Sequence, residues 1–159
     1  MTLPFTAHVA LTHLGVRSIS VKAADRFSWI VEGDPKWKAD LDDWLRAYQA
    51  KKPIPLKAPL DLDGYPPFTK KVLYELTKIP FGETCSYADI AKRVDNPLGS
   101  RAVGQACGRN PILLIIPCHR VIASNGGLGG FSGGGRIKQE LLRFERECKS
   151  LKNISNSHK

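Results

Sequence analysis

Long apolar runs, a secretion signal and paired cysteines are all missing from this sequence of 159 residues. No stretch approaches the roughly 18 consecutive apolar residues that a helix needs to span a bilayer. The start, Met1-Thr2-Leu3-Pro4, lacks the basic and apolar regions of a signal peptide. We therefore expect a soluble intracellular protein that has no membrane partner. It would be cytoplasmic or, in a eukaryote, nuclear.

Cysteine is scarce and irregularly placed. The sequence has four, namely Cys85, Cys107, Cys118 and Cys148. No two of them form a CxxC pair, and only His8 and His13 precede Cys85 as further ligands, so the pattern does not support a zinc site. Four cysteines are also too few for a secreted disulfide scaffold. We expect reduced thiols and neither a metal nor a cofactor.

Acidic residues are outnumbered, because 24 Lys and Arg stand against 15 Asp and Glu, a net charge of +9. Residues 1–60 carry 9 basic and 6 acidic residues, and residues 61–159 carry 15 and 9. A basic excess that is larger in the C-terminal part suits a phosphate-rich partner such as nucleic acid.

The first part of the chain has the pattern of an α/β domain. Residues 3–31 alternate apolar and polar side chains in short runs, which predicts a small antiparallel sheet. From Pro35, apolar residues recur at helical spacing up to Tyr48, which predicts one helix that covers the sheet with core aromatics. We expect this N-terminal α/β domain to occupy residues 1–52.

Prolines 53, 55 and 59 interrupt both patterns, so we place a linker at residues 53–65. A mainly α C-terminal domain should follow at residues 66–150, because helical periodicity returns from about Pro66 and again from Arg136. The polar segment at residues 151–159 is expected to be a frayed tail.

Two short helices joined by a turn are predicted inside this second domain. Ser86-Tyr87-Ala88-Asp89 has the form of a capping box. The turn Asn96-Pro97-Leu98-Gly99 follows, and Ser100 is placed to cap the next helix. This is the pattern of a helix-turn-helix, although ordinary helical hairpins share it. The small residues of the second helix, Ala102, Gly104, Ala106 and Gly108, permit close approach of another backbone, either protein or nucleic acid.

A glycine-rich loop follows, with seven glycines between Ser124 and Gly135. Such a loop brings main-chain amides close to a ligand. It lacks the Gly-Lys-Ser/Thr ending of a phosphate-binding loop, and no GxGxxG motif runs from a strand into a helix.

Cys118 is the candidate nucleophile, because it stands beside His119 after an apolar run. A cysteine reacts as the thiolate, so it needs a base or a stabilising neighbour at neutral pH. Adjacent side chains of an extended segment point in opposite directions, so contact between the two would require a bend or a bridging water. Glu145 in the last helix is a candidate to orient the histidine. A buried structural cysteine is the alternative, and it is our interpretation of the other three.

The segment Pro117-Cys118-His119-Arg120-Val121 closely resembles the active-site signature of the O6-alkylguanine-DNA alkyltransferases, also called methylated-DNA-protein-cysteine methyltransferases. Further motifs stand at the family's spacing: Phe81-Gly82-Glu83, Ser86-Tyr87, Arg101-Ala102-Val103-Gly104, Asn110-Pro111, Phe131-Ser132-Gly133-Gly134 and the segment from Lys138 to Glu145. The resemblance covers about residues 66–147, whereas the first 60 residues resemble the family only in layout.

The resemblance implies direct repair of double-stranded DNA, in which an O6-alkylated guanine is flipped out of the duplex and its alkyl group moves irreversibly to the protein. By matching position, Cys118 would be the acceptor, His119 its water-mediated base and Glu145 the residue that orients this histidine. Asn110 would be the hinge between the recognition helix and an active-site strand. Tyr87 would act near the displaced phosphate. The protein is expected to be a monomer.

The remaining implied roles concern the substrate and the DNA. The substrate-binding residues would be Tyr87, Val121, Phe131, Ser132 and Gly133. The DNA-binding residues would be Arg101, Ala102, Gly104 and Gln105. Arg101 would enter the stack where the base has left it. Arg120, like Lys92, Arg93 and Arg109, is interpreted as surface charge or a general phosphate contact.

Two alternatives differ in kind from repair. An alkyltransferase-like protein would recognise the lesion without transfer, but such proteins lack the acceptor cysteine that this chain has at position 118. A cysteine hydrolase could use the same Cys, His and Glu, although an adjacent nucleophile and base are unusual for that chemistry. Leu113 stands where some relatives have a second proline, which leaves the tolerated size of the alkyl group open.

Overall fold

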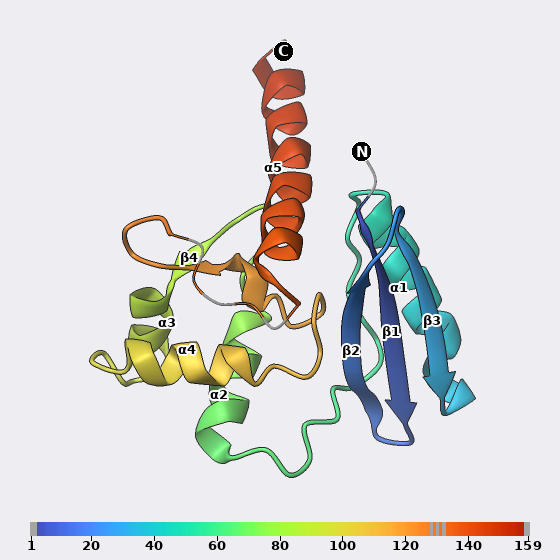
Figure 1. The fold of residues 1–159 in the computed structure, drawn as a ribbon, viewed down its shortest axis with the longest axis horizontal. Coiled ribbons are helices and arrows are strands. Elements are labelled where there is room, and N and C mark those ends of the chain that lie inside the picture. Colours follow the sequence, from blue (N-terminus) through green and yellow to red (C-terminus); the bar gives the residue numbers. More distant parts are fainter. Residues whose placement is uncertain (1–2, 128, 130, 132, 158–159) are drawn as a thin grey trace.

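The computed structural model describes residues 3–127, 129, 131 and 133–157, with side chains described as far as Glu147. Figure 1 shows a sheet with one covering helix beside a group of helices, and a long last helix that rises between them. Among the described residues, every helix is too short or too polar to cross a membrane.

The N-terminal sheet consists of β1 (Phe5–Thr12), β2 (Gly15–Ala23) and β3 (Ser28–Gly33), in the order β2-β1-β3. Along β1, alternate residues from Phe5 to Leu11 are buried, because successive side chains of a strand point to opposite faces. The strands β1 and β2 pair antiparallel as predicted, but β3 lies parallel to β1. The sheet is therefore mixed, and the prediction of a purely antiparallel sheet was wrong for its third strand.

One face of the sheet is covered by α1 (Lys38–Gln49), which follows the short 3-10 helix η1 (Pro35–Trp37). Asp34 caps η1 by accepting a hydrogen bond from the Lys36 amide. The apolar face of α1 buries Leu41, Trp44, Leu45 and Tyr48. These are the helical positions that the sequence predicts to face the core.

The predicted linker is firmly attached to the edge of β2. The Val16 amide donates to the Pro59 carbonyl at 2.9 Å, and the Asp61 amide donates to the Val16 carbonyl at 2.8 Å. Gly15 has a φ of 128°, and a β-carbon there would overlap the Pro59 carbonyl. Only glycine fits such a position without moving the linker.

The C-terminal part contains α2 (Pro67–Leu76), β4 (Cys85–Ser86), α3 (Tyr87–Arg93), α4 (Ser100–Gly108), η2 (Cys118–Arg120), β5 (Val121–Ile122) and α5 (Gly135–Ser157). The strands β4 and β5 pair parallel. The predicted capping box at α3 is confirmed, with Ser86 and Asp89 each bonded to the other's amide. The predicted cap at Ser100 is wrong, since Gly99 is the N-cap and no side chain caps α4. The helix α5 continues to Ser157, into the segment 151–159 that the sequence predicts to be a frayed tail.

The two parts share one core, which includes buried residues of both. Ile19 of β2 bonds with the segment after α4, because its amide donates to the Pro111 carbonyl at 2.9 Å and its carbonyl accepts from the Leu113 amide at 3.1 Å. The N-terminal sheet thus supports the segment that leads to Cys118.

Candidate active site

Cys118 and His119 lie on a tight turn rather than in an extended segment. Both belong to the 3-10 helix η2, whose residue Arg120 donates its amide to the Pro117 carbonyl at 2.9 Å. Successive side chains of a 3-10 helix are separated by about 120° around its axis, so they need not point in opposite directions. Cys118 is 3% exposed and His119 is fully buried. The resemblance implies an active-site strand here, and the structure has this 3-10 turn instead.

Asn110 connects α4 to the turn through two side-chain hydrogen bonds. Its amide group donates to the Ile116 carbonyl at 2.8 Å, and its carbonyl oxygen accepts from the Ile112 amide at 2.9 Å. The loop that these bonds close contains Leu114 with a φ of 72°, a conformation that costs a residue other than glycine about 1–2 kcal/mol. Asn110 therefore holds a strained loop in the shape that presents Cys118.

Behind the cysteine, His119 is bonded to Glu145 of α5. The distance from His119 Nε2 to Glu145 Oε2 is 2.6 Å, and Glu145 is 1% exposed. A carboxylate only accepts hydrogen bonds, so we assign the imidazole proton to Nε2. Nδ1 then carries the lone pair, and it is buried without a hydrogen-bond partner among the described residues. Nδ1 is the atom of this ring that can accept a proton.

Arg120 also belongs to this cluster, contrary to its interpretation as surface charge. Its Nε lies 2.7 Å from Glu145 Oε1, and its Nη1 donates to the Ile79 carbonyl at 2.7 Å. The side chain is only 9% exposed. A buried guanidinium needs a partner of opposite charge, and Glu145 supplies it.

Two further donors complete the surroundings of Glu145. The Tyr48 hydroxyl donates to Oε2 at 2.6 Å, and the Gly82 amide donates to Oε1 at 3.2 Å. Burial alone would raise the pKa of the Glu145 carboxyl, but its electrostatic interactions and hydrogen bonds with His119 and Arg120 hold that pKa well below its usual range. We refer to Tyr48, Gly82, His119, Arg120 and Glu145 as the Glu145 network.

The Cys118 thiol is held in its protonated form at rest. Burial raises the pKa of Cys118, although a hydrogen bond from Asn110 and the charge of Lys138 act in the opposite direction. Lys138 is fully buried and donates from Nζ to the Val121 carbonyl at 2.7 Å. Burial and the charge of Cys118 raise the pKa of Cys107 to about 12, so this second thiol is inert.

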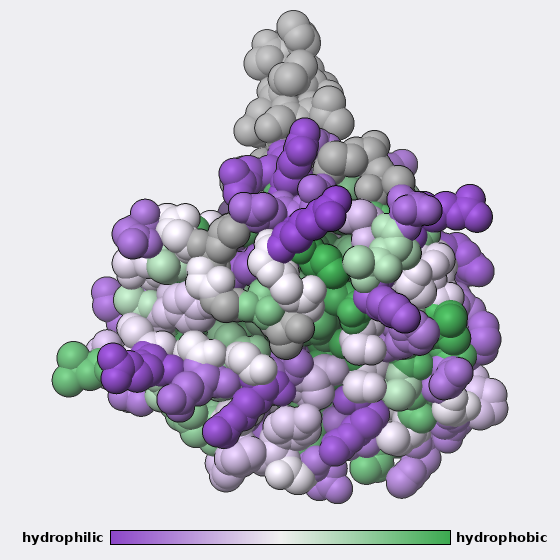
Figure 2. Space-filling model, in the orientation of Figure 1, coloured by the Kyte–Doolittle hydropathy of each residue, from purple (hydrophilic) through white to green (hydrophobic). Residues whose placement is uncertain are grey.

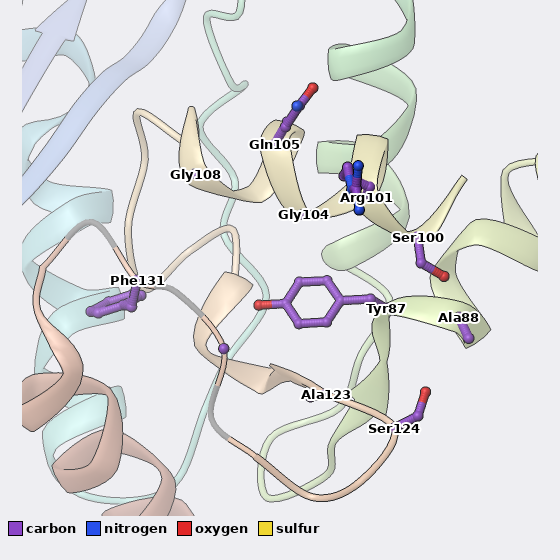
Figure 3. A pocket seen from close by; sticks show the side chains of 11 residues that line it. Tyr87, Ala88, Ser100, Arg101, Gly104, Gln105, Gly108, Ala123, Ser124 and Phe131 are labelled. Atoms are coloured by element: carbon purple, nitrogen blue, oxygen red, sulfur yellow. The ribbon is translucent and has the colours of Figure 1, made fainter. Parts of the chain in front are cut away.

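A pocket of about 740 Å³ opens between α3, α4 and the segment of residues 123–131. Figure 3 shows Tyr87 projecting across it from the start of α3, with Arg101 and Gln105 on α4. The predicted site residues that line it are Tyr87, Arg101, Gly104, Gln105 and Phe131. Cys118 is not part of the lining that the described residues form.

The remaining predicted substrate-binding and DNA-binding residues are not part of the pocket lining that the described residues form, and one of them lies outside the described part. Val121 is fully buried, Ala102 is half-buried on α4, and Phe131 meets the His119 ring edge-on with the centroids 6.5 Å apart. A β-carbon at Gly133 would lie 2.6 Å from the Phe131 ring and 2.7 Å from Val21 of β2. Ser132 lies outside the described residues.

In residues 3–147 apart from the gaps at 128, 130 and 132, no cluster of metal ligands is found.

The small residues of α4 divide between the two explanations that the sequence left open. Ala106 is buried and packs inside the domain, as do Val103 and Cys107. Gly104 and Gly108 line the pocket, and no atom of the described part of the chain lies within 4 Å of a β-carbon built at Gly108. One face of α4 therefore belongs to the core, and the other is left open. Figure 2 shows hydrophilic side chains over the outer edge of α4.

Comparison with known proteins places this geometry in a family. Residues 67–147 match the family model described as 6-O-methylguanine DNA methyltransferase, DNA binding domain. A methylated-DNA--protein-cysteine methyltransferase of Saccharolobus solfataricus is 44% identical over 118 residues, which are 72% of this chain and 76% of that protein. The protein of the same name from Methanosarcina acetivorans is 53% identical over 81 residues, about half of each chain (51% and 52%).

Solved structures agree over a larger part of the chain. The crystal structure of Mycobacterium tuberculosis OGT in complex with DNA has a TM-score of 0.72 and 31% identity, and the match covers 90% of this chain and 94% of that one. The O6-methylguanine-DNA methyltransferase of Pyrococcus kodakaraensis, with a TM-score of 0.62 at 23% identity, shares the fold. Since the family model matches the segment that carries Cys118, His119 and Glu145, the chain belongs to the 6-O-methylguanine DNA methyltransferase family.

Proposed function

We propose that this protein repairs DNA directly, by transferring an alkyl group from O6 of a guanine to the sulfur of Cys118. The observation that carries the proposal is the state of His119, adjacent to the cysteine. Its Nε2 is held by Glu145 at 2.6 Å, and its buried Nδ1 has no hydrogen-bond partner among the described residues. This is the arrangement that a buried thiol with a raised pKa needs in order to lose its proton.

The reaction is a single displacement. The thiol proton passes to His119, directly or through a water molecule, and the imidazolium that forms is stabilised by Glu145. The sulfur lone pair forms the bond to the alkyl carbon while the bond from that carbon to O6 breaks. The electron pair leaves with guanine, whose developing charge is neutralised by hydrogen bonding or proton donation. The thioether product cannot be hydrolysed by this site, so each molecule acts once.

The target base must leave the duplex, because a base inside the stack cannot reach a buried sulfur. Arg101 is exposed at the start of α4 and would fill the space that the base leaves. The open face of α4 with Gly104 and Gln105 would lie in the minor groove, where close approach requires small residues. Unstacking costs a few kcal/mol, which a side chain inserted in the gap partly offsets.

The flipped base would enter the pocket beside Tyr87. Tyr87 and Ser132 would hold it, and Phe131 and Gly133 would shape the wall. The main chain of Cys118 and Val121 would read its edges. The Val121 carbonyl already accepts a hydrogen bond from Lys138, but a carbonyl has a second lone pair for the base. We propose that the protein acts as a monomer, without metal or cofactor.

Intact-protein mass after mixing with a duplex that contains one O6-methylguanine tests this function. We expect a gain of one methyl group per chain that stops after one equivalent and is absent in Cys118→Ser. An unchanged mass while the lesion duplex stays bound would leave a protein that recognises the lesion without repairing it. Turnover of an activated ester that depends on Cys118 would instead indicate a cysteine hydrolase.

A further inference from the structure

We propose that Tyr48, on helix α1 of the N-terminal domain, is a positioning residue for the transfer reaction, because it fixes the carboxylate that orients His119. The proposal rests on the function proposed above, since it assigns a role in that reaction. Tyr48 stands 97 residues before Glu145 in the chain, yet its hydroxyl donates to Oε2 at 2.6 Å. It lies outside the segment that matches the family model, residues 67–147.

The hydroxyl of Tyr48 is not needed for packing. Its ring stacks on Trp44 and Phe144 with centroids 5.5 and 5.7 Å away, and it meets Phe81 edge-on at 5.5 Å. A phenylalanine would keep all three ring contacts. Without a hydrogen-bond partner, the hydroxyl would carry a large desolvation penalty in this fully buried position. Its pairing with Glu145 is therefore the feature that distinguishes tyrosine from phenylalanine here.

The Tyr48 hydroxyl keeps its proton at neutral pH and therefore donates to Glu145. Burial and the negative charge of Glu145 both raise the pKa of Tyr48 well above its usual value. Tyr48 therefore behaves as a fixed, uncharged hydrogen-bond donor. Arg120 neutralises the charge of the carboxylate through two contacts, at 2.7 Å to Oε1 and 3.3 Å to Oε2.

Tyr48 and His119 donate to the same oxygen. When Nδ1 of His119 accepts the Cys118 proton, the imidazolium and Glu145 compete for the other ring proton, on Nε2, across a hydrogen bond of 2.6 Å. A donor on Oε2 lowers the electron density that this oxygen offers to the imidazole, so the proton stays on the histidine. Tyr48 also restrains the carboxylate plane, and through it the orientation of the ring. In this way α1 takes part in setting the strength and position of the base.

Among the described residues, a small set of other charged or titratable groups acts on this site. His119 and Arg120 of η2 act on Glu145 directly. Lys138 of α5 acts on Cys118, and Cys118 in turn acts on Cys107 of α4. Lys51 lies over the Phe144 ring, with Nζ 4.4 Å from its centroid, and pairs with Glu147 at 3.5 Å. Replacing the Tyr48 hydroxyl leaves each of these groups in place, so its effect can be measured by itself.

The test compares Tyr48→Phe with the wild type and with Trp44→Phe. Trp44 stacks on the same ring but is not one of the donors to Glu145, so this control reproduces a change of packing. Single-turnover methyl transfer is measured across pH, together with Tm and the affinity for lesion DNA. A second assay follows the rate at which iodoacetamide alkylates Cys118, read by peptide mass. This assay involves no DNA, so it remains informative even if the wild type transfers no methyl group.

For Tyr48→Phe we expect a transfer rate at least tenfold lower at the pH optimum, with DNA affinity unchanged. We expect the acid limb of both rate profiles to move to higher pH, because a carboxylate with one donor fewer makes the imidazole a stronger base. The control Trp44→Phe should leave the acid limbs of both rate profiles at their wild-type pH. Coincident profiles for wild type and a folded Tyr48→Phe would overturn the proposal, and so would an equal shift in Trp44→Phe. A wild type that transfers no methyl group would contradict the proposed function alone.

Discussion

The two sides of the Cys118–Arg120 turn differ in how their polar groups are satisfied. Behind the turn, Glu145 is enclosed by donors from α1, the loop after α2 and the turn itself. In front, α4 presents exposed Arg101 and Gln105, and a pocket of about 740 Å³ stands open. A buried carboxylate whose two oxygens are both hydrogen-bonded fixes the geometry of its donors, whereas an open face leaves its groups for a partner. We therefore propose that the first side carries the chemistry and the second side carries recognition.

The largest effect should follow from Glu145→Gln, which breaks the closed side. The change leaves the buried Arg120 without a compensating charge, so we expect a loss of about 3–5 kcal/mol in the free energy of unfolding. Methyl transfer should fall at least a hundredfold, within the range that general base catalysis contributes. Denaturant unfolding and single-turnover rates measure both effects. The matched control is Glu147→Gln on the same helix, whose partly exposed ion pairs with Lys51 and Arg143 contribute about 1 kcal/mol or less.

The same pair of variants has a distinct pH signature. The folded-state pKa of Glu145 is lowered, so its contribution is complete above the unfolded value of about 4.3 and is lost as pH falls through the folded value. Below about pH 4.3 the wild type should lose up to about 1.4 kcal/mol per pH unit more than Glu145→Gln does. The Glu147→Gln control should retain the wild-type slope, and parallel curves for all three would contradict the lowered pKa.

Arg101→Ala should damage the open side without affecting the closed one. Arg101 is exposed, so its removal should change the free energy of unfolding by no more than about 0.5 kcal/mol. Without a side chain to fill the stack, transfer from duplex DNA should slow about tenfold to thirtyfold, which corresponds to about 1.4–2 kcal/mol. The reaction of Cys118 with iodoacetamide should be unchanged. Arg93→Ala is the control, and an equal slowing there would reduce Arg101 to a general phosphate contact.

The sequence predicted the reactive centre better than its supports. Cys118, His119 and Glu145 stand out because nucleophile, base and carboxylate have recognisable chemistry, and the structure joins the last two at 2.6 Å. Tyr48 was predicted only as a core residue, because helical periodicity reports burial and not the partner of a hydroxyl. Arg120 was misinterpreted since arginine is usually exposed. Its buried carboxylate partner is 25 residues away in the chain.

One missed residue had left a signal in the sequence. Lys138 precedes Leu141, Leu142 and Glu145 by three, four and seven residues. This spacing places all four residues on one face of α5, the buried face. A lysine on such a face needs a buried acceptor, and the Val121 carbonyl provides it. The turn at Cys118 has no comparable signal in the sequence. Side-chain hydrogen bonds of Asn110 hold it, and an apolar run does not predict such hydrogen bonds. The parallel pairing of β3 was equally hidden, because alternation gives the faces of a strand but not its neighbour.

Alkylation of Cys118 should destabilise the protein less than Glu145→Gln does, with an effect confined to the closed side. The thiol is 3% exposed, so an added methyl group must displace packed neighbours, at a cost of about 1–3 kcal/mol. We expect the methylated protein, freed of product DNA, to melt at a lower temperature than the unreacted protein, and the ethylated protein at a still lower one. Cys118→Ser treated with the same DNA should show no shift. A Tm equal to or above that of the unreacted protein would indicate unfilled space around the sulfur.

The smallest expected effect separates the two sides most cleanly. At Gly104 a β-carbon would meet, of the residues that the structure describes, only the Tyr87 ring, at an ordinary 3.9 Å. Alanine in a helix interior is favoured over glycine by about 1 kcal/mol, so Gly104→Ala should raise the free energy of unfolding by up to that amount. The same methyl group would stand on the face proposed to enter the minor groove, so affinity for lesion DNA should fall. Gly108→Ala, near the end of the helix and open to solvent, is the comparison. If Gly104→Ala stabilised the protein and left DNA affinity intact, glycine would be needed neither for stability nor for DNA binding. The proposal that α4 approaches the minor groove closely would then be wrong.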